Sequence, residues 1–162
     1  MKTHDLRNFL IWCVCGLTLT AMSAGTAFAQ GPGKYVKDAS DRLAAMVDKA
    51  AKDGYAFPPN SFGLGGAFLK KDTKAWVPVF TVQLTEGRTY VFMAAGDRDT
   101  RDLDLDIQDA TGKTLVADTD TAAEATVTFT PQVSGRYTVR LRLYDSVDGL
   151  PCYCIAAMMS KD

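Results

Sequence analysis

Histidine is almost absent from this sequence, since the only one among the 162 residues is His4. His4 falls in an N-terminal segment that we expect to be removed, which would leave the mature chain without histidine. That excludes Ser-His-Asp and Cys-His nucleophilic catalysis and every His-ligated metal site. Cysteine is also scarce: of the 4 cysteines, only Cys152 and Cys154 follow the N-terminal segment. The disulfide framework typical of small secreted domains is therefore excluded too.

A strong excess of charge of either sign is also missing. The chain has 18 Lys and Arg against 19 Asp and Glu, a formal net charge of -1. No basic patch stands out, so the sequence does not predict binding to nucleic acid or to an anionic membrane.

The N-terminal segment has the pattern of a secretory signal peptide. An apolar stretch over residues 9–22 follows a polar start and is succeeded by small residues ending in Ala27-Phe28-Ala29. This is an A-x-A cleavage site, and the apolar stretch is shorter than the roughly 20 residues of a spanning helix. We expect residues 1–29 to be removed, which predicts a secreted or periplasmic protein without a transmembrane segment. The alternative is an uncleaved membrane anchor.

An amphipathic helix is predicted over residues 34–53, within a segment 30–66 that also holds a leader and a Gly/Pro-rich loop. Tyr35, Ala39, Leu43 and Ala50 recur at helical spacing, and charged residues occupy the other positions. Gly54 and the prolines beyond it end the helix. We expect the apolar stripe to pack on its own domain; docking to a partner is the alternative.

The rest of the chain, residues 67–162, alternates apolar and polar residues with the period of two of β-strands. Turn signals separate the runs at the spacing of about 8–12 residues that is typical of antiparallel sandwiches. The sequence therefore predicts an all-β, jelly-roll-like antiparallel β-sandwich of seven or eight strands, preceded by one helix. Beyond a first strand from Ala67, the clearest runs are 79–84, 90–95, 102–107, 115–117, 125–129, 137–143 and 152–159.

Residues 76–144 resemble the bacterial pre-peptidase C-terminal domain family. The resemblance lies in Asp102-Leu103-Asp104-Leu105 and in the strand from Gly135 through Tyr137-Thr138-Val139, with weaker matches at 80–84, 90–92 and 129–131. It implies a secreted jelly-roll-like module that acts as a binding or processing appendage beside peptidases and not as a catalyst. Some related domains bind calcium. This chain departs from the family in its helix, its C-terminal Cys-x-Cys strand and the lack of an attached peptidase.

Carboxylates cluster at two places where strands are expected to end. Calcium prefers several hard oxygen ligands, which a loop around residues 97–102 and another around 118–120 would supply. The interpretation to test is a weak calcium site formed by Asp97, Asp99, Asp102, Asp118 and Asp120. The alternative is a solvated acidic surface, in which Asp104 and Asp106 point at solvent and pair with arginines across the sheet.

Cys152 and Cys154 lie two residues apart on one face of the last expected strand. Their side chains would be about 6.5–7 Å apart, too far for easy disulfide formation. Met158 shares that face, which allows a Cu(I) site as one interpretation. The other is a small apolar pair packed in the core.

The function that these observations favour is a non-catalytic secreted or periplasmic binding or structural module with a protein or polysaccharide partner. An Asp-based secreted hydrolase is the alternative, because glycosidases need only two carboxylates about 5–9 Å apart in a cleft. A copper-handling protein using the Cys-x-Cys strand is a third. No stretch of the sequence indicates a cleft.

Overall fold

The structure is a computed structural model that describes residues 33–59, 61–71 and 75–161. The expected signal peptide and its cleavage point lie outside the described residues. Within them, no helix is both long and apolar enough to cross a membrane. One helix precedes eight strands: α1 (Gly33–Lys52), β1 (Leu64–Leu69), β2 (Val77–Leu84), β3 (Thr89–Gly96), β4 (Thr100–Gln108), β5 (Thr114–Asp118), β6 (Glu124–Phe129), β7 (Gly135–Ser146) and β8 (Cys152–Lys161).

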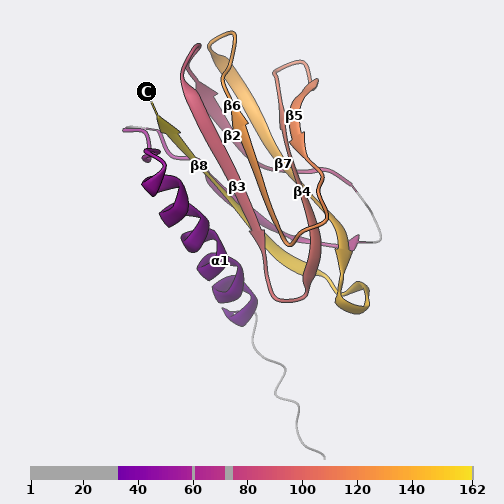
Figure 1. The fold of residues 1–162 in the computed structure, drawn as a ribbon. Helices are drawn as coiled ribbons and strands as arrows, with labels where there is room; N and C mark the ends of the chain where they lie inside the picture. Colours follow the sequence, from indigo (N-terminus) through magenta and orange to yellow (C-terminus); the bar gives the residue numbers. More distant parts are fainter. Residues whose placement is uncertain (1–32, 60, 72–74, 162) are drawn as a thin grey trace, which may run out of the picture.

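The strands form two antiparallel four-stranded sheets that pack face to face (Figure 1). We call the sheet with order β1-β8-β3-β6 the helix-side sheet, and the one with order β2-β7-β4-β5 the far sheet. Eight antiparallel strands divided between two such sheets are the arrangement of a jelly roll. The predicted all-β sandwich preceded by one helix is therefore confirmed.

The main core lies between the sheets and follows the predicted alternation. In β4, Leu103, Leu105 and Ile107 are fully buried and face the helix-side sheet. Phe92 of β3 and Met158 of β8 approach from the opposite side and are also fully buried. Burying each side chain of this size stabilises the fold by about 1.5–3 kcal/mol, so this layer supplies most of the driving force for folding.

Helix α1 covers the outer face of the helix-side sheet, over β3 and β8 (Figure 1). Leu43 and Ala50 of α1 form a second apolar cluster with Val91 and Met93 of β3 and with Met159 of β8. Nearly all of β3 is buried as a result, although alternation alone would leave one of its faces polar. The prediction that the helix packs on its own domain is confirmed, and Gly54 follows it at a φ of 87°.

The outer face of the far sheet is covered by its own charged side chains. The guanidinium of Arg140 donates to Asp106 at 2.5 and 2.9 Å, and Arg142 Nε donates to Asp104 at 2.5 Å. The Trp76 ring lies 5.2 Å from the Arg140 guanidinium and 4.7 Å from that of Arg142. The predicted cross-strand Asp–Arg pairs are confirmed.

The expectation that Asp104 and Asp106 point at solvent is wrong, because each is only 1% exposed. The long arginine side chains and the indole lie over the shorter carboxylates, so these ion pairs are part of the buried structure.

The first strand begins at Leu64, three residues before the predicted start at Ala67. Gly65 lies so close to β2 that an added Cβ would be 2.3 Å from the carbonyl oxygen of Val79. Glycine is needed here for this close approach between the sheets, which explains why a Gly-rich segment forms a strand where the sequence predicts a turn.

Candidate functional site

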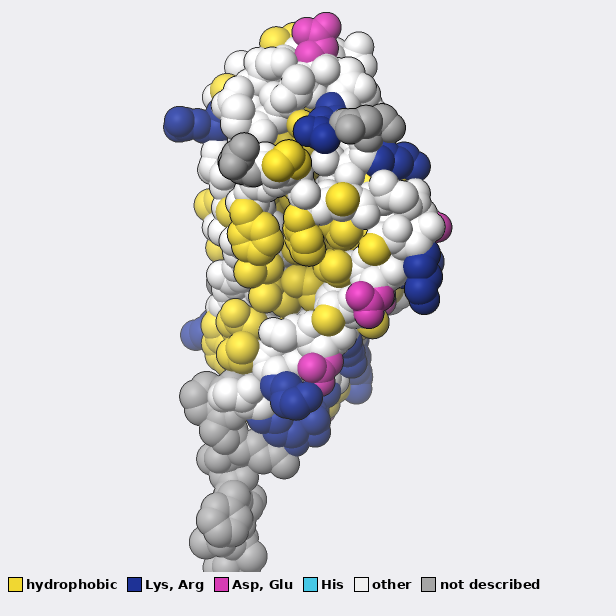
Figure 2. Space-filling model, turned by 90° about the vertical axis from the view of Figure 1, so that its left-hand side faces the viewer, with side chains coloured by type: hydrophobic (Ala, Val, Ile, Leu, Met, Phe, Trp, Pro, Cys, Tyr) yellow, Lys and Arg dark blue, Asp and Glu magenta, His cyan; other side chains and the backbone are white. Residues whose placement is uncertain are grey.

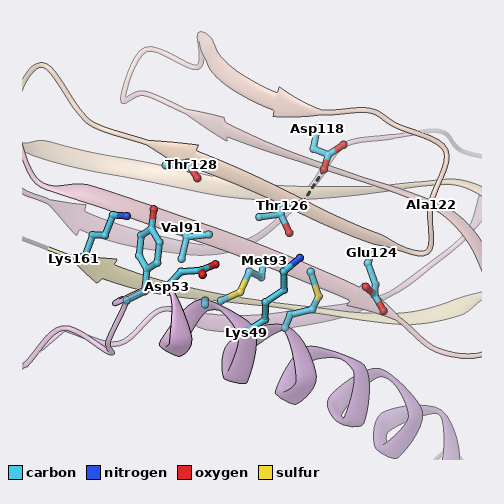
Figure 3. Close-up of a pocket in the computed structure, with 13 residues that line it drawn as sticks. Lys49, Asp53, Val91, Met93, Asp118, Ala122, Glu124, Thr126, Thr128 and Lys161 are labelled. Carbon is cyan, nitrogen blue, oxygen red and sulfur yellow. Dashed lines mark hydrogen bonds between the residues drawn. The ribbon is translucent and has the colours of Figure 1, made fainter.

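A groove with a volume of about 790 Å³ lies between α1 and β6. Val91 and Met93 of β3 form its floor, and both are at most 4% exposed. One wall carries Lys49 of α1 and Asp53 directly after the helix, and the other carries Thr126 and Thr128 of β6 (Figure 3). The groove therefore has an apolar floor and polar walls, as most small-molecule and peptide sites do.

The position of α1 creates this groove. The helix packs on β8 and β3, whereas β6 is the edge strand beyond β3. The outward-facing residues of β6 are Glu124, Thr126 and Thr128, all exposed, because alternation places Ala125 and Val127 in the core. Their polar side chains need no cover, so the helix leaves this strand open to solvent.

Charges of both signs are distributed along the groove (Figure 3). Glu124 and Lys161 stand at opposite ends, with Lys49 between them. Lys161 Nζ lies 4.5 Å from the centre of the Tyr55 ring, so the cation already occupies one aromatic face. Asp118 is held in place by the backbone N–H of Thr126, which donates to its Oδ2 at 2.8 Å.

A smaller apolar hollow of about 340 Å³ lies on the other side of α1, toward β1 and β8. Figure 2 shows hydrophobic side chains gathered in the middle of this face. Phe62 is 65% exposed, Phe57 45% and Leu64 46%, beside Val47 of the helix. Exposed apolar surface of this kind is typical of contact sites.

The carboxylates predicted to bind calcium lie in different environments. Asp97 is fully buried at the β3–β4 turn, where the backbone N–H of Tyr153 donates to its Oδ2 at 2.7 Å. The N–H of Asp99 donates to the other oxygen at 3.0 Å, so both Asp97 oxygens fix the backbone. Asp102 lies on the outer face of the far sheet, in a separate small pocket.

Of the second carboxylate pair, Asp118 borders the groove and Asp120 does not. Asp118 accepts hydrogen bonds from the backbone of Thr126 and of Asp120, and Asp120 itself is exposed. Among residues 33–59, 61–71 and 75–161, no three Asp, Glu, Cys or His side chains form a group that could hold a metal ion. Calcium binding stays a prediction of the sequence.

Cys152 and Cys154 are free thiols buried in the core, as one of the two sequence interpretations expects. Burial raises the pKa of Cys152 to about 11 and also raises the pKa of Cys154. Both thiols therefore stay protonated near neutral pH, whereas copper binds the thiolate.

Of the charged and polar groove residues, the sequence singled out only Asp118, as a candidate calcium ligand, because the others belong to no chemical motif. Thr126 and Thr128 are ordinary outward positions of a strand, and Lys49 is an ordinary polar position of a helix. The sequence does hold one signal for them, in the residues that face outward from the two strands. The outward residues of β3, at positions 91, 93 and 95, are apolar, whereas those of β6, at positions 124, 126 and 128, are polar. That contrast marks which strand the helix covers and which it leaves open.

Comparison with protein-family models gives no match, and no curated protein is significantly similar to the chain in sequence.

Proposed function

We propose that this chain is a non-catalytic binding module of the extracytoplasmic space, which holds an extended peptide segment of a protein partner in the groove between α1 and β6. The observation that carries the proposal is the groove itself, with its apolar floor and charges of both signs. The resemblance to pre-peptidase C-terminal domains points to the same role, since those modules are binding appendages.

The chemistry of the groove favours a peptide over a polysaccharide. Sugar rings stack on open aromatic faces, and the one aromatic residue among the groove's described lining residues is Tyr55, which already contacts Lys161. A peptide matches the remaining groups: carboxylates and ammonium groups pair with its charged side chains, and the threonine hydroxyls bond its backbone. Met46 and Met93 supply a flexible apolar floor that adapts to different side chains.

Short fluorescent peptides test this proposal. A displayed library would be screened against the chain from Gln30 onward for peptides that carry both acidic and basic side chains among apolar ones. The affinities of the enriched peptides would then be measured by fluorescence anisotropy. Reversing the charge of a wall residue, Lys49→Glu, should weaken binding about tenfold, or roughly 1.4 kcal/mol. Lys52→Glu is the matched control, because Lys52 is on the same helix but does not line the groove.

Equal affinities for the two variants would overturn the groove as the site, as would a library from which no peptide is enriched. Hydrolase profiling tests the competing class: turnover that a single Asp→Asn substitution abolishes would overturn the non-catalytic assignment. Calcium stabilisation is a separate proposal, and a calcium-specific rise in Tm relative to magnesium would support it.

A further inference from the structure

A third hollow lies on the outer face of the far sheet, where β4 and β7 meet the loop that follows β5. Its volume is about 290 Å³, close to the lower bound of about 300 Å³ for small-molecule sites. It is lined by Asp102, Asp104, Thr119, Thr121, Arg142 and Tyr144. This pocket belongs to the opposite sheet from the groove, so an inference about it is independent of the proposed function.

Asp102 is the unusual group in this pocket. It is 6% exposed, and its Oδ1 accepts no hydrogen bond from any described residue. Burial, together with the charges of Asp104 and Asp145, raises the pKa of Asp102 above its ordinary value, and the nearby charge of Arg142 offsets only part of this rise. A buried carboxylate without a partner is costly, and a bound group that supplies positive charge and donors would remove that cost.

The neighbouring carboxylates already have such partners within the protein. Asp104 accepts from Arg142 Nε at 2.5 Å, and Asp145 accepts from Lys71 Nζ at 2.6 Å. Asp102 lies between them, opposite Asp145 in the β4–β7 register. The pocket is therefore a place where one negative charge remains to be balanced from outside.

A monovalent ammonium group fits this place better than a divalent metal ion. Calcium takes 6–8 oxygen ligands and favours several carboxylates, whereas the lining has two, one of them paired with Arg142. The guanidinium in the wall also repels a dication more strongly than a monocation. An ammonium group has three donors, which Asp102 and the hydroxyls of Thr119 and Thr121 can accept.

The rest of the lining points to a hydroxylated ligand. Every described lining residue is charged or carries a hydroxyl, Tyr144 included. The lining has little apolar surface on which the methylene groups of a lysine side chain could pack. A sugar ring carrying an amine would present hydroxyls to the threonines. The Tyr144 ring already faces the Arg142 guanidinium, 5.4 Å from the ring centre, so the recognition depends on Asp102 and the threonines and not on stacking.

We propose that this pocket binds an amino sugar with a free, protonated amine, which forms an ion pair with Asp102 and hydrogen bonds with Thr119 and Thr121. The ligand class is thus a de-N-acetylated hexosamine unit, held by one charge and a few hydroxyl contacts. Such a site is expected to be weak for a single unit, with a Kd near 1 mM.

The test is a titration of the uniformly ¹⁵N-labelled chain with glucosamine near neutral pH, followed by NMR. Glucosamine should shift the amides of residues 102–104 and 119–121 saturably. Glucose and N-acetylglucosamine lack the charged amine and should bind at least tenfold more weakly. Lysine, which has the ammonium but no ring hydroxyls, should also bind at least tenfold more weakly.

Asp102→Asn should abolish the glucosamine shifts while leaving the spectrum folded, because the substitution keeps the size of the side chain. Asp120→Asn is the matched control, an exposed acid of the same loop outside the lining, and it should bind like the unsubstituted chain. Equal binding of glucosamine and glucose would overturn the proposal, as would unchanged binding by Asp102→Asn. Calcium shifts at these amides that Asp120→Asn removes would replace the amino sugar with calcium.

Discussion

The two outer faces of the sandwich are covered in opposite ways. On the helix-side sheet, Val91 and Met93 of β3 point outward and are buried under α1. On the far sheet, Asp104 and Asp106 of β4 point outward and are buried under arginines and Trp76. Both faces exclude water, yet one depends on apolar contact and the other on paired charges.

The difference shows why the hollows lie where they do. The apolar residues on the outer face of the helix-side sheet need a separate element, α1, to cover them. Because α1 is narrower than the sheet, a groove remains between the helix and the edge strand β6. A row of carboxylates is covered by neighbours in the same sheet, and a hollow appears where one carboxylate has no arginine opposite, as at Asp102. Substitutions that break each cover separately test whether the two differ in this way.

The largest expected effect comes from breaking one charged pair. Arg140→Leu leaves the carboxylate of Asp106, 1% exposed, without its guanidinium. Breaking a buried pair costs about 3–5 kcal/mol, and the lower value is expected because Thr114 still donates to Asp106 at 2.8 Å. Urea denaturation measures this loss.

The double variant Asp106→Leu/Arg140→Leu separates charge from packing. It should recover most of the loss, since a well-packed apolar pair often equals or exceeds a buried ion pair. A double variant as unstable as Arg140→Leu alone would show that this cover depends on the shape of the arginine and not on its charge.

Shortening an apolar side chain of α1 should destabilise the fold somewhat less than breaking the charged pair. Leu43 is 5% exposed between α1 and the helix-side sheet, so Leu43→Ala should lower the free energy of unfolding by about 2–3 kcal/mol. Val36→Ala is the control: this residue of the same helix is 41% exposed and should cost at most about 0.5 kcal/mol. A similar loss in both variants would mean that the helix itself, and not its buried stripe, is being weakened.

Much of this fold could be predicted from the sequence, because alternation and turn residues act locally. The strands over 102–107 and 137–143 and the helix over 34–53 were all found within a few residues. Local patterns could not show which outward-facing residues of a strand are covered by residues far away in the sequence. The burial of Asp104 and Asp106 escaped prediction for that reason, since it depends on Arg140, Arg142 and Trp76 across the sheet.

A smaller change in stability, this time an increase, is expected from substituting the unpaired carboxylate of Asp102. Because the pKa of Asp102 is raised in the fold, its ionisation destabilises the folded state at neutral pH. Asp102→Asn should therefore raise stability near pH 7 by on the order of 1 kcal/mol. The penalty is full above the raised pKa, falls as the pH drops through it, and is gone only below the ordinary value of 3.8.

Thermal melts of both chains across this pH window measure the difference. The gain from Asp102→Asn should shrink steadily as the solution is acidified, because both side chains are then neutral. A gain that does not change with pH would assign the effect to packing and remove the raised pKa as its cause.

The smallest effect is expected in the apolar hollow beside β1. Phe62 is 65% exposed, so Phe62→Ser should change the free energy of unfolding by no more than about 0.5 kcal/mol. Sedimentation at increasing concentration should show no greater self-association than the unsubstituted chain. A loss of more than about 1 kcal/mol would mean that this ring belongs to the core.

The groove was harder to predict than the fold, because a site of this kind has no residue motif. Its floor is made of β3, its walls come from α1 and β6, and Tyr55 and Lys161 lie at one end. Those segments lie far apart in the sequence, and only the packing of α1 over β3 and β8 brings them together. The acidic residues that the sequence did single out mainly fix turns, as Asp97 does.

The most direct test of the proposed peptide-binding role is a map of where a peptide contacts the chain. An enriched peptide would be added to the ¹⁵N-labelled chain, and the amide shifts would be followed by NMR. The account predicts saturable shifts at Lys49, Asp53, Thr126 and Thr128, and none of comparable size on the outer face of the far sheet. Shifts confined to the hollow beside β1 or to the far sheet, with the amides of α1 and β6 unmoved, would contradict it.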